Sequence, residues 1–367
     1  MILPFILTPM VLSVISSFAM WFGLVPVASR SVEWTVPVLA SGYLATGSVS
    51  GSLLQAFNLI VGTMIYIPFI KQSERVQDRE FLGKIKRLEA SMNEDERSVW
   101  VRDFRWNTYE NQQTAKLLAS DLEYALSKGA LELYYQPQVK RDGTLYGCEA
   151  LLRWNYMGQG FVYPPLIIAL AVQGDFIGSL GMYIVEKACR DMAGTHTQAG
   201  CPVSFSVNIL PLELEDPSFA DQVLRILKDT GVEGSNLTIE LTEQVALNPG
   251  PNLERQLEKL RESRVRISMD DFGMGHGSLN YLNSAHYDEV KIDGSLIRRL
   301  PEHTQTCELV GNIMNMSRIL GVSTVAECVE TPEQIQMLEK LGCSIYQGYY
   351  YSRPLPLDAF IEYVKGL

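Results

Sequence analysis

The chain has 367 residues, of which 47% are hydrophobic and 20% charged, with a formal net charge of -11 at pH 7. This length is typical of about two domains, and the composition supplies enough apolar side chains for a sizeable core. The acidic balance excludes a broad footprint on duplex nucleic acid, because such a surface needs clustered lysine and arginine. The six cysteines are scattered, which favours reduced thiols over a zinc site or a disulfide framework.

The first seventy or so residues carry almost no charge. Residues 2–26 are apolar without one formal charge, which exceeds the ~20 residues that cross a hydrocarbon core, and they lack the basic start of a signal peptide. Residues 36–51, rich in glycine and serine, predict a re-entrant segment, and residues 52–70 predict a spanning helix. Lys71 and two arginines follow at once, which predicts that this end faces the cytoplasm. We therefore expect an anchor in the inner or plasma membrane and a cytoplasmic remainder.

Several short motifs occur within this nearly uncharged part. They are Pro4-Phe-Ile-Leu-Thr-Pro9, Gly23-Leu-Val-Pro26, Trp34-Thr-Val-Pro37, Ser41-Gly-Tyr-Leu-Ala-Thr-Gly47 and Ile65-Tyr-Ile-Pro-Phe-Ile70. By these motifs, residues 1–71 resemble the C-terminal end of the membrane permease subunit (component IIC, lactose/cellobiose type) of bacterial sugar phosphotransferase systems. Most of the transport path of that family is missing, so the resemblance implies a permease remnant that acts as an anchor.

Residues 72–112 change abruptly to a charged composition. Val76, Phe81, Ile85 and Leu88 recur there at helical spacing, which predicts a helical connector. Two interpretations stay open. The helix is either a solvated spacer or a dimerising helix that relays a membrane event to the rest of the chain.

From residue 113 onward, short apolar segments alternate with amphipathic helical patterns. Strands are predicted at residues 131–139, 147–154, 203–209, 237–242, 266–272, 289–293, 323–326 and 346–351. Helices are predicted at residues 117–127, 184–193, 220–230, 252–263, 307–320 and 332–341. Eight strands with intervening helices over about 250 residues predict an α/β fold, a TIM-like (β/α)8 barrel. A doubly wound open sheet would need a glycine-rich phosphate turn, which the sequence lacks.

Acidic residues stand at or just past the ends of these predicted strands. They are Glu149, Glu240, Glu243, Asp270, Asp271, Asp293, Glu327 and Glu330. A buried ionised carboxylate is unfavourable unless it is paired or binds a metal. Because a barrel brings its strand ends together, we expect these side chains to converge on one site. Carboxylate ligands favour Mg²⁺ or Mn²⁺ over zinc or iron.

The same part of the chain carries an ordered set of motifs. They are Tyr135-Gln-Pro137, Glu149-Ala-Leu-Leu-Arg-Trp154, Val207-Asn208, Glu240-Leu-Thr-Glu243, Asp270-Asp-Phe-Gly-Met-Gly275, Lys291-Ile-Asp293, Ala326-Glu-Cys-Val-Glu330 and Gln347-Gly-Tyr349. By this set, residues 113–367 resemble the EAL-domain family, which hydrolyses cyclic di-GMP. The resemblance implies a cyclic-guanylate-specific phosphodiesterase that opens the ring to linear pGpG with two divalent cations, Mg²⁺ or Mn²⁺.

The resemblance also implies roles for individual residues. The implied metal ligands are Glu149, Asn208, Glu240, Asp270, Asp271 and Glu327. The implied catalytic residues are Lys291, which orients or deprotonates the attacking water, Glu327, and Glu243, which holds the loop after Asp271. The implied substrate-binding or supporting residues are Gln136, Arg153, Asp293 and Gln347, with Glu330 in support. Asp293 and Glu330 are equally compatible with a purely structural role.

Local geometry qualifies two of these assignments. Adjacent strand residues point to opposite faces, so Asp270 and Asp271 converge only if the strand breaks there, and we expect Gly273 and Gly275 to supply the break. The aromatic run Tyr349–Tyr351 is more typical of barrel wall than of a base-stacking platform.

Two other functions stay open beside the phosphodiesterase. One is a catalytically silent cyclic di-GMP receptor, and the other is a sugar-transport component with a regulatory cytosolic domain. The complete set of carboxylates together with Lys291 favours the enzyme. The partners expected on this interpretation are cyclic di-GMP, the membrane and a second copy of the chain in a homodimer, without duplex nucleic acid.

Overall fold

The computed structural model describes residues 81–89, 109–243, 251–273, 287–300 and 303–367. The anchor predicted for residues 1–71 and most of the connector lie outside these ranges. Within them, no helix combines the length and the apolar character that a bilayer crossing requires. The chain divides into two compact units, residues 1–81 and 82–367, and the fold described here is that of the second unit.

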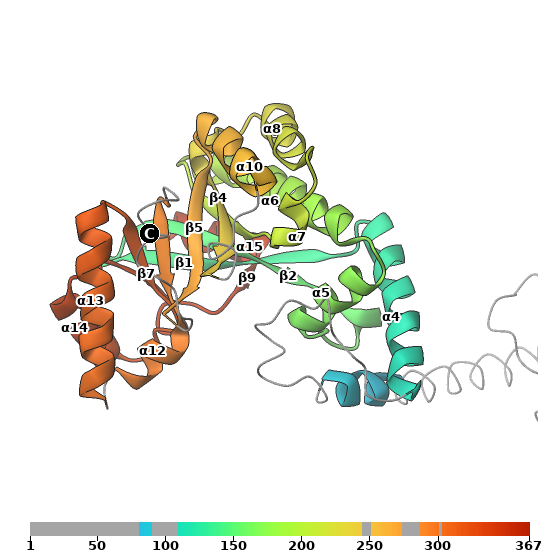
Figure 1. Ribbon diagram of the computed structural model, residues 1–367, viewed down its shortest axis with the longest axis horizontal. Helices are drawn as coiled ribbons and strands as arrows, with labels where there is room; N and C mark the ends of the chain where they lie inside the picture. The colour runs from blue at the N-terminus through green and yellow to red at the C-terminus, as the bar shows by residue number, and fades with distance from the viewer. Residues whose placement is uncertain (1–80, 90–108, 244–250, 274–286, 301–302) are drawn as a thin grey trace, which may run out of the picture. The chain divides into compact units, whose positions relative to one another are not determined.

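A closed barrel organises the second unit (Figure 1). Its strands are β1 (Glu132–Lys140), β2 (Leu145–Arg153), β3 (Phe205–Asn208), β4 (Leu237–Thr242), β5 (Arg266–Phe272), β6 (Glu289–Ile292), β7 (Ser323–Ala326) and β8 (Ile345–Gln347). Strands β2 to β8 pair in chain order, and β1 pairs with both β2 and β8, which closes the barrel. A short strand, β9 (Leu355–Pro356), adds to β1. The predicted TIM-like barrel is confirmed.

Strand β1 departs from the regular alternation that the sequence predicts. It runs antiparallel to β2 and to β8, whereas β2 to β8 are mutually parallel. Only residues 141–144 separate β1 from β2. A parallel crossover needs a dozen or more residues, so this connection can only be a hairpin. A β-hairpin therefore takes the place of the first β/α repeat.

Helices surround the barrel. They are α4 (Tyr109–Ser127), α5 (Pro164–Gln173), α6 (Ile177–Ala199), α7 (Pro211–Leu214), α8 (Phe219–Thr230), α10 (Pro251–Glu262), α12 (Gly294–Arg299), α13 (Thr304–Leu320), α14 (Pro332–Leu341) and α15 (Leu357–Lys365). All the helices predicted from residue 113 onward are present, several of them longer than expected. Helices α5, α7, α12 and α15 were not predicted from the sequence, and each is short or begins at a proline or glycine.

The core on the outer side of β1 joins distant parts of the chain. The Tyr135 ring lies 5.2 Å from the Phe205 ring of β3 and 5.6 Å from the Phe360 ring of α15, between ring centroids. Its hydroxyl donates a hydrogen bond to Asp191 of α6. Because side chains alternate along a strand, Gln136 then points the other way, into the barrel. The same alternation turns polar residues of β1 toward the barrel interior.

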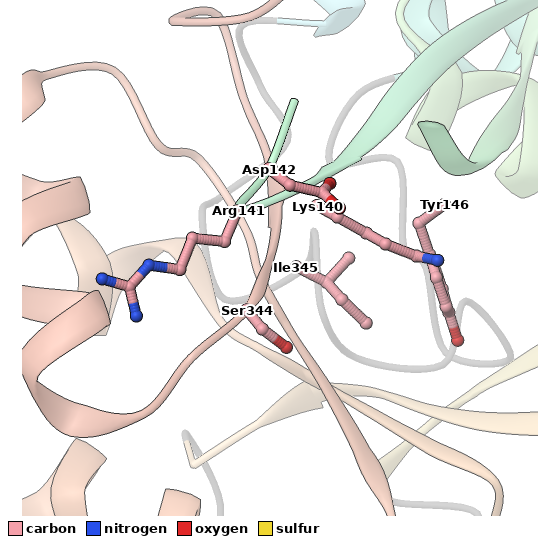
Figure 2. Close-up of a pocket in the computed structure, with 6 residues that line it drawn as sticks. All are labelled: Lys140, Arg141, Asp142, Tyr146, Ser344 and Ile345. Carbon is pink, nitrogen blue, oxygen red and sulfur yellow. The ribbon is translucent and has the colours of Figure 1, made fainter. Parts of the chain in front are cut away.

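A pocket of about 510 Å³ lies at the end of the barrel where β2 and β8 begin (Figure 2). It is lined by Lys140, Arg141, Asp142, Tyr146, Ser344 and Ile345. The Lys140 side chain extends over the Tyr146 ring, with Nζ 5.9 Å from its centroid, whereas Arg141 points away and pairs with Glu339. The predicted carboxylate site belongs to the other end, where the parallel strands finish, so this pocket is separate from it.

Residues 81–89 of the connector form a helix that belongs to the second unit from Leu82 onward. Ile85 and Leu88 are buried, with exposed fractions of 3% and 0%. Glu89 Oε1 accepts a hydrogen bond of 3.0 Å from the backbone N–H of Tyr163, at the start of α5. The solvated-spacer interpretation is therefore wrong for this stretch.

A buried carboxyl group follows β3. Glu213 of α7 is 5% exposed, and its Oε2 accepts a hydrogen bond of 2.7 Å from the backbone N–H of Leu210. Its Oε1 accepts none from the described residues and presses against Gly181 of α6, where an added Cβ would lie 1.4 Å away. Burial raises the pKa of Glu213 to about 8, and the hydrogen bond from Leu210 only partly opposes that rise.

We predict that Glu213→Gln removes a pH dependence of stability. The folded pKa exceeds the ordinary value of 4.5, so the native state binds more protons between these values. The stability contributed by protonated Glu213 is fully present below pH 4.5 and is lost as pH rises through 8. Urea unfolding between pH 5 and 9 should show the variant more stable at pH 8 by on the order of 2 kcal/mol. Glu215→Gln, at an exposed neighbour, is the control, and identical pH profiles for Glu213→Gln and wild type would contradict the assignment.

Candidate functional site

Polar side chains converge where the parallel strands end, and a buried lysine lies at their centre. Lys291 of β6 is completely buried. Its Nζ lies 2.8 Å from Glu327 Oε1, 2.9 Å from Glu240 Oε2, 3.2 Å from Glu149 Oε2 and 3.3 Å from Asp270 Oδ1. These carboxylates come from four different strands or strand ends. The convergence predicted from the sequence is confirmed for all of them.

Amide side chains fix the Glu149 carboxylate from both sides. Asn208 Nδ2 donates to Glu149 Oε1 over 2.7 Å, and Gln347 Nε2 donates to Glu149 Oε2 over 2.5 Å. Gln347 also donates to Gln136 Oε1, and both glutamines are buried. Burial alone would raise the pKa of Glu149, but Lys291 and the two amides outweigh it and lower that pKa. Inside the barrel, Gln347 thus holds Glu149 directly, and Gln136 holds Gln347.

The two adjacent aspartates converge because β5 is irregular. The pairing register of β5 with β6 shifts between Met269 and Phe272, and Asp271 has a left-handed φ of 56°. This bulge turns Asp271 to the same side as Asp270, where both approach Glu327 with oxygens within 4.8 Å of one another. We predicted that Gly273 and Gly275 break the strand. The break instead begins at Asp271 itself, and Gly273 continues it with a φ of 103°. Gly275 lies outside the described residues.

Too much negative charge gathers here for one lysine to balance. Burial, followed by the charge of Glu149, raises the pKa of Glu240 well above its usual range. Burial and neighbouring carboxylates raise the pKa of Asp271 to about 7 and that of Glu327 to about 8. Burial would lower the pKa of Lys291, but the surrounding carboxylates outweigh it and raise that pKa well above its ordinary value. Lys291 therefore carries a positive charge, and the surplus negative charge calls for protons or further cations.

The residues present fit divalent cations. Asp270, Asp271 and Glu327 bring three carboxylates within reach of one ion. Glu240 Oε1 is buried and accepts no hydrogen bond from the described part of the chain, and buried Asp270 Oδ1 has the Lys291 ammonium 3.3 Å away. Buried anionic oxygens without donors are unfavourable unless a cation coordinates them. An all-oxygen set of this kind suits Mg²⁺ or Mn²⁺.

The remaining predicted residues surround the cluster at different distances. Glu243 Oε2 accepts a hydrogen bond of 3.3 Å from Gly273 N, as expected of a residue that holds the turn after Asp271. Asp293 caps α12 by accepting from Ser295 N over 2.9 Å, and its charge contributes to the raised pKa of Asp271. Glu330 is exposed and lies apart from the ion pairs of Lys291. Asp293 therefore caps a helix beside Asp271, and the substrate-binding role predicted for it and the supporting role predicted for Glu330 stay predictions.

Arg153 ends β2 on the rim of this site. Its Nη1 donates to the carbonyl oxygen of Leu152 over 2.8 Å, and its guanidinium lies 5.7 Å from the centroid of the Tyr134 ring. Burial lowers the pKa of Arg153, yet it makes no ion pair within the described ranges. A half-buried guanidinium without a carboxylate partner is suited to bind an anionic ligand such as a phosphate.

Two residues of the aromatic run after β8 differ from the prediction. The barrel-wall interpretation is wrong for Tyr349 and Tyr350, which are 51% and 46% exposed. The Arg353 guanidinium lies 4.3 Å from the centroid of the Tyr349 ring. The available signal was their position directly after β8, at the barrel end where loops carry binding residues.

Comparison with known proteins agrees with this geometry. Residues 119–354 match the family described as the EAL domain. The cyclic di-GMP phosphodiesterase NbdA of Pseudomonas aeruginosa is 35% identical over 250 residues, which are 68% of this chain and 32% of NbdA. The cyclic di-GMP phosphodiesterase RocR of the same organism is 31% identical over 252 residues, 67% of this chain and 63% of RocR. A solved complex of the PaMucR phosphodiesterase with c-di-GMP has 34% identity and a TM-score of 0.63, over 66% of this chain and 99% of that one.

The chain therefore belongs to the EAL-domain family. The match covers the barrel and ends short of the first hundred residues, so the permease resemblance of residues 1–71 finds no support in these comparisons. The aligned region spans about a third of the length of NbdA.

We predict that Mg²⁺ or Mn²⁺ raises the melting temperature through this cluster. A ligand at 100 times its dissociation constant stabilises a protein by about 2.7 kcal/mol, which for a barrel of this size corresponds to roughly 5–10 °C. Asp271→Asn should lose at least half of that shift, because the amide removes one anionic ligand. Asp142→Asn, in the hairpin between β1 and β2, is the control. Equal shifts in wild type and Asp271→Asn would exclude a metal at this cluster.

Proposed function

We propose that this protein is a membrane-anchored, metal-dependent phosphodiesterase that hydrolyses cyclic di-GMP to linear pGpG. The observation that carries the proposal is the single buried lysine surrounded by four carboxylates, beside a fifth on the β5 bulge. Membership of the EAL-domain family supports it, and so do relatives named as cyclic di-GMP phosphodiesterases.

The chemistry explains the need for this charge distribution. A phosphodiester carries a negative charge that repels hydroxide, and two divalent cations would neutralise that charge and lower the pKa of a shared water. Glu149, Asn208, Glu240 and Asp270 would hold one cation, and Asp270, Asp271 and Glu327 would hold the other. Gln347 keeps Glu149 in place and ionised.

Lys291 and Arg153 would act on the anionic groups of the reaction. A charged ammonium donates hydrogen bonds, so Lys291 can orient the attacking water or neutralise a phosphate oxygen. Arg153 would hold a phosphate of the substrate through its planar fork. Glu243 would keep the turn after Asp271 in the shape that presents its carboxylate.

The first part of the chain would place this activity at the membrane. The nearly uncharged character of residues 1–70, which contain only Arg30 and Glu33 as charged residues and are followed at once by Lys71, supports an anchor with the catalytic barrel in the cytoplasm. The permease-like motifs support descent of this anchor from a sugar transporter. The connector would join two copies of the chain in a homodimer.

We predict that Glu149→Gln lowers hydrolysis of cyclic di-GMP by roughly 10²-fold or more, since it removes an anionic ligand from the centre of the site. The full-length chain in detergent would be supplied with Mg²⁺ or Mn²⁺, and conversion to pGpG would be followed chromatographically. Asp142→Asn should remain as active as wild type. Tight binding of cyclic di-GMP by wild type without turnover would replace the phosphodiesterase by the silent receptor.

A further inference from the structure

The connector helix contacts the segment that frames the substrate-binding side of the site. Residues 154–163 link β2, which carries Glu149 and Arg153, to α5. We call residues 154–163 the rim hairpin. Val162 N donates to Trp154 O over 2.9 Å, and Asn155 bridges Phe161 in antiparallel register. Glu89 Oε1 accepts from Tyr163 N at the base of this hairpin, where α5 begins.

The rim hairpin in turn contacts the environment of Arg153. The Phe161 ring packs edge-on against the Tyr134 ring of β1, with centroids 5.5 Å apart and an interplanar angle of 76°. The same Tyr134 ring lies under the Arg153 guanidinium. Moving the hairpin would therefore shift Phe161 away from the Tyr134 ring that lies under the Arg153 guanidinium.

The opposite side of the hairpin is held independently. The Tyr156 ring is buried against Trp154, with centroids 5.3 Å apart, and its hydroxyl donates to Asp121 of α4 over 2.9 Å. Two helices thus restrain the hairpin, α4 through Asp121 and the connector helix through Glu89. Only the second restraint comes from the segment that leads toward the membrane anchor.

We infer that Glu89 is a positioning residue for Arg153, acting through Tyr163, the rim hairpin and Tyr134, and that it sets the affinity of the site for its phosphodiester substrate. The inference rests on the proposed function. Figure 1 shows the connector helix, in blue, beside the first turns of α4, where Arg87 also pairs with Glu110 at 3.6 Å. That second contact is exposed and does not reach the hairpin, so it offers a matched control.

The test compares Glu89→Ala, Glu89→Gln and Glu110→Ala in the full-length chain. Glu89→Ala removes the acceptor of the charge-assisted hydrogen bond from Tyr163 N and so frees the base of the rim hairpin. KM for cyclic di-GMP should rise about five-fold in Glu89→Ala while kcat stays within about two-fold, the pattern of lost substrate binding. Glu89→Gln keeps an acceptor oxygen and should restore most of the affinity. Glu110→Ala should match wild type.

Two further readouts separate positioning from general destabilisation. Hydrogen exchange of the Tyr163 amide should accelerate in Glu89→Ala and not in Glu110→Ala. Phe161→Ala should raise KM as well, and the double variant with Glu89→Ala should add little, because both act on the same Arg153 contact.

Three outcomes overturn the inference. KM could be unchanged in Glu89→Ala although the Tyr163 amide exchanges faster. Glu89→Ala and Glu110→Ala could raise KM equally. The effects of Glu89→Ala and Phe161→Ala could add in full. Failure of the proposed function has a different signature, since wild type itself would then form no pGpG.

Discussion

The site depends on one buried ammonium group. Lys291 has no exposed surface and contacts four carboxylates that come from β2, β4, β5 and the end of β7. Removing either sign of charge would leave the other buried without a partner, which is strongly destabilising. The barrel must therefore hold strands distant in sequence at fixed spacing simply to keep this group of charges together. The same rigidity presents oxygens to cations without further rearrangement.

The sequence allowed the barrel and most of the site to be predicted, for a physical reason. Carboxylates such as Glu149 and Glu240 interrupt apolar strands, and such a residue is tolerated only where other charges meet it. The bulge at Asp271 could not be predicted, because an aspartate with left-handed φ looks in sequence like any other strand residue. The convergence of the two aspartates was right, and the residue that causes it was not.

The features that were not predicted have different local causes. Helix α5 begins at Pro164, which reads as a break in sequence although proline is favourable in the first turn of a helix. Hairpin β1–β2 replaces the expected repeat because residues 140–146, between the two predicted strands, are too few for a parallel crossover, a sign that the sequence carried and the prediction overlooked. Ile85 and Leu88 gave a helical period, but nothing in that period indicated whether their partner was water, a second chain or the barrel.

The closure of the barrel by β1 constrains the order of folding. Gln138 of β1 donates a hydrogen bond to Gln347 of β8, across 209 residues of chain. Until β8 has left the ribosome, β1 has only its hairpin partner β2, and one edge of the growing sheet stays open. Contacts of such long sequence separation form slowly. During synthesis one edge of β1 therefore stays unpaired until β8 is complete, for most of the time that translation of the barrel takes.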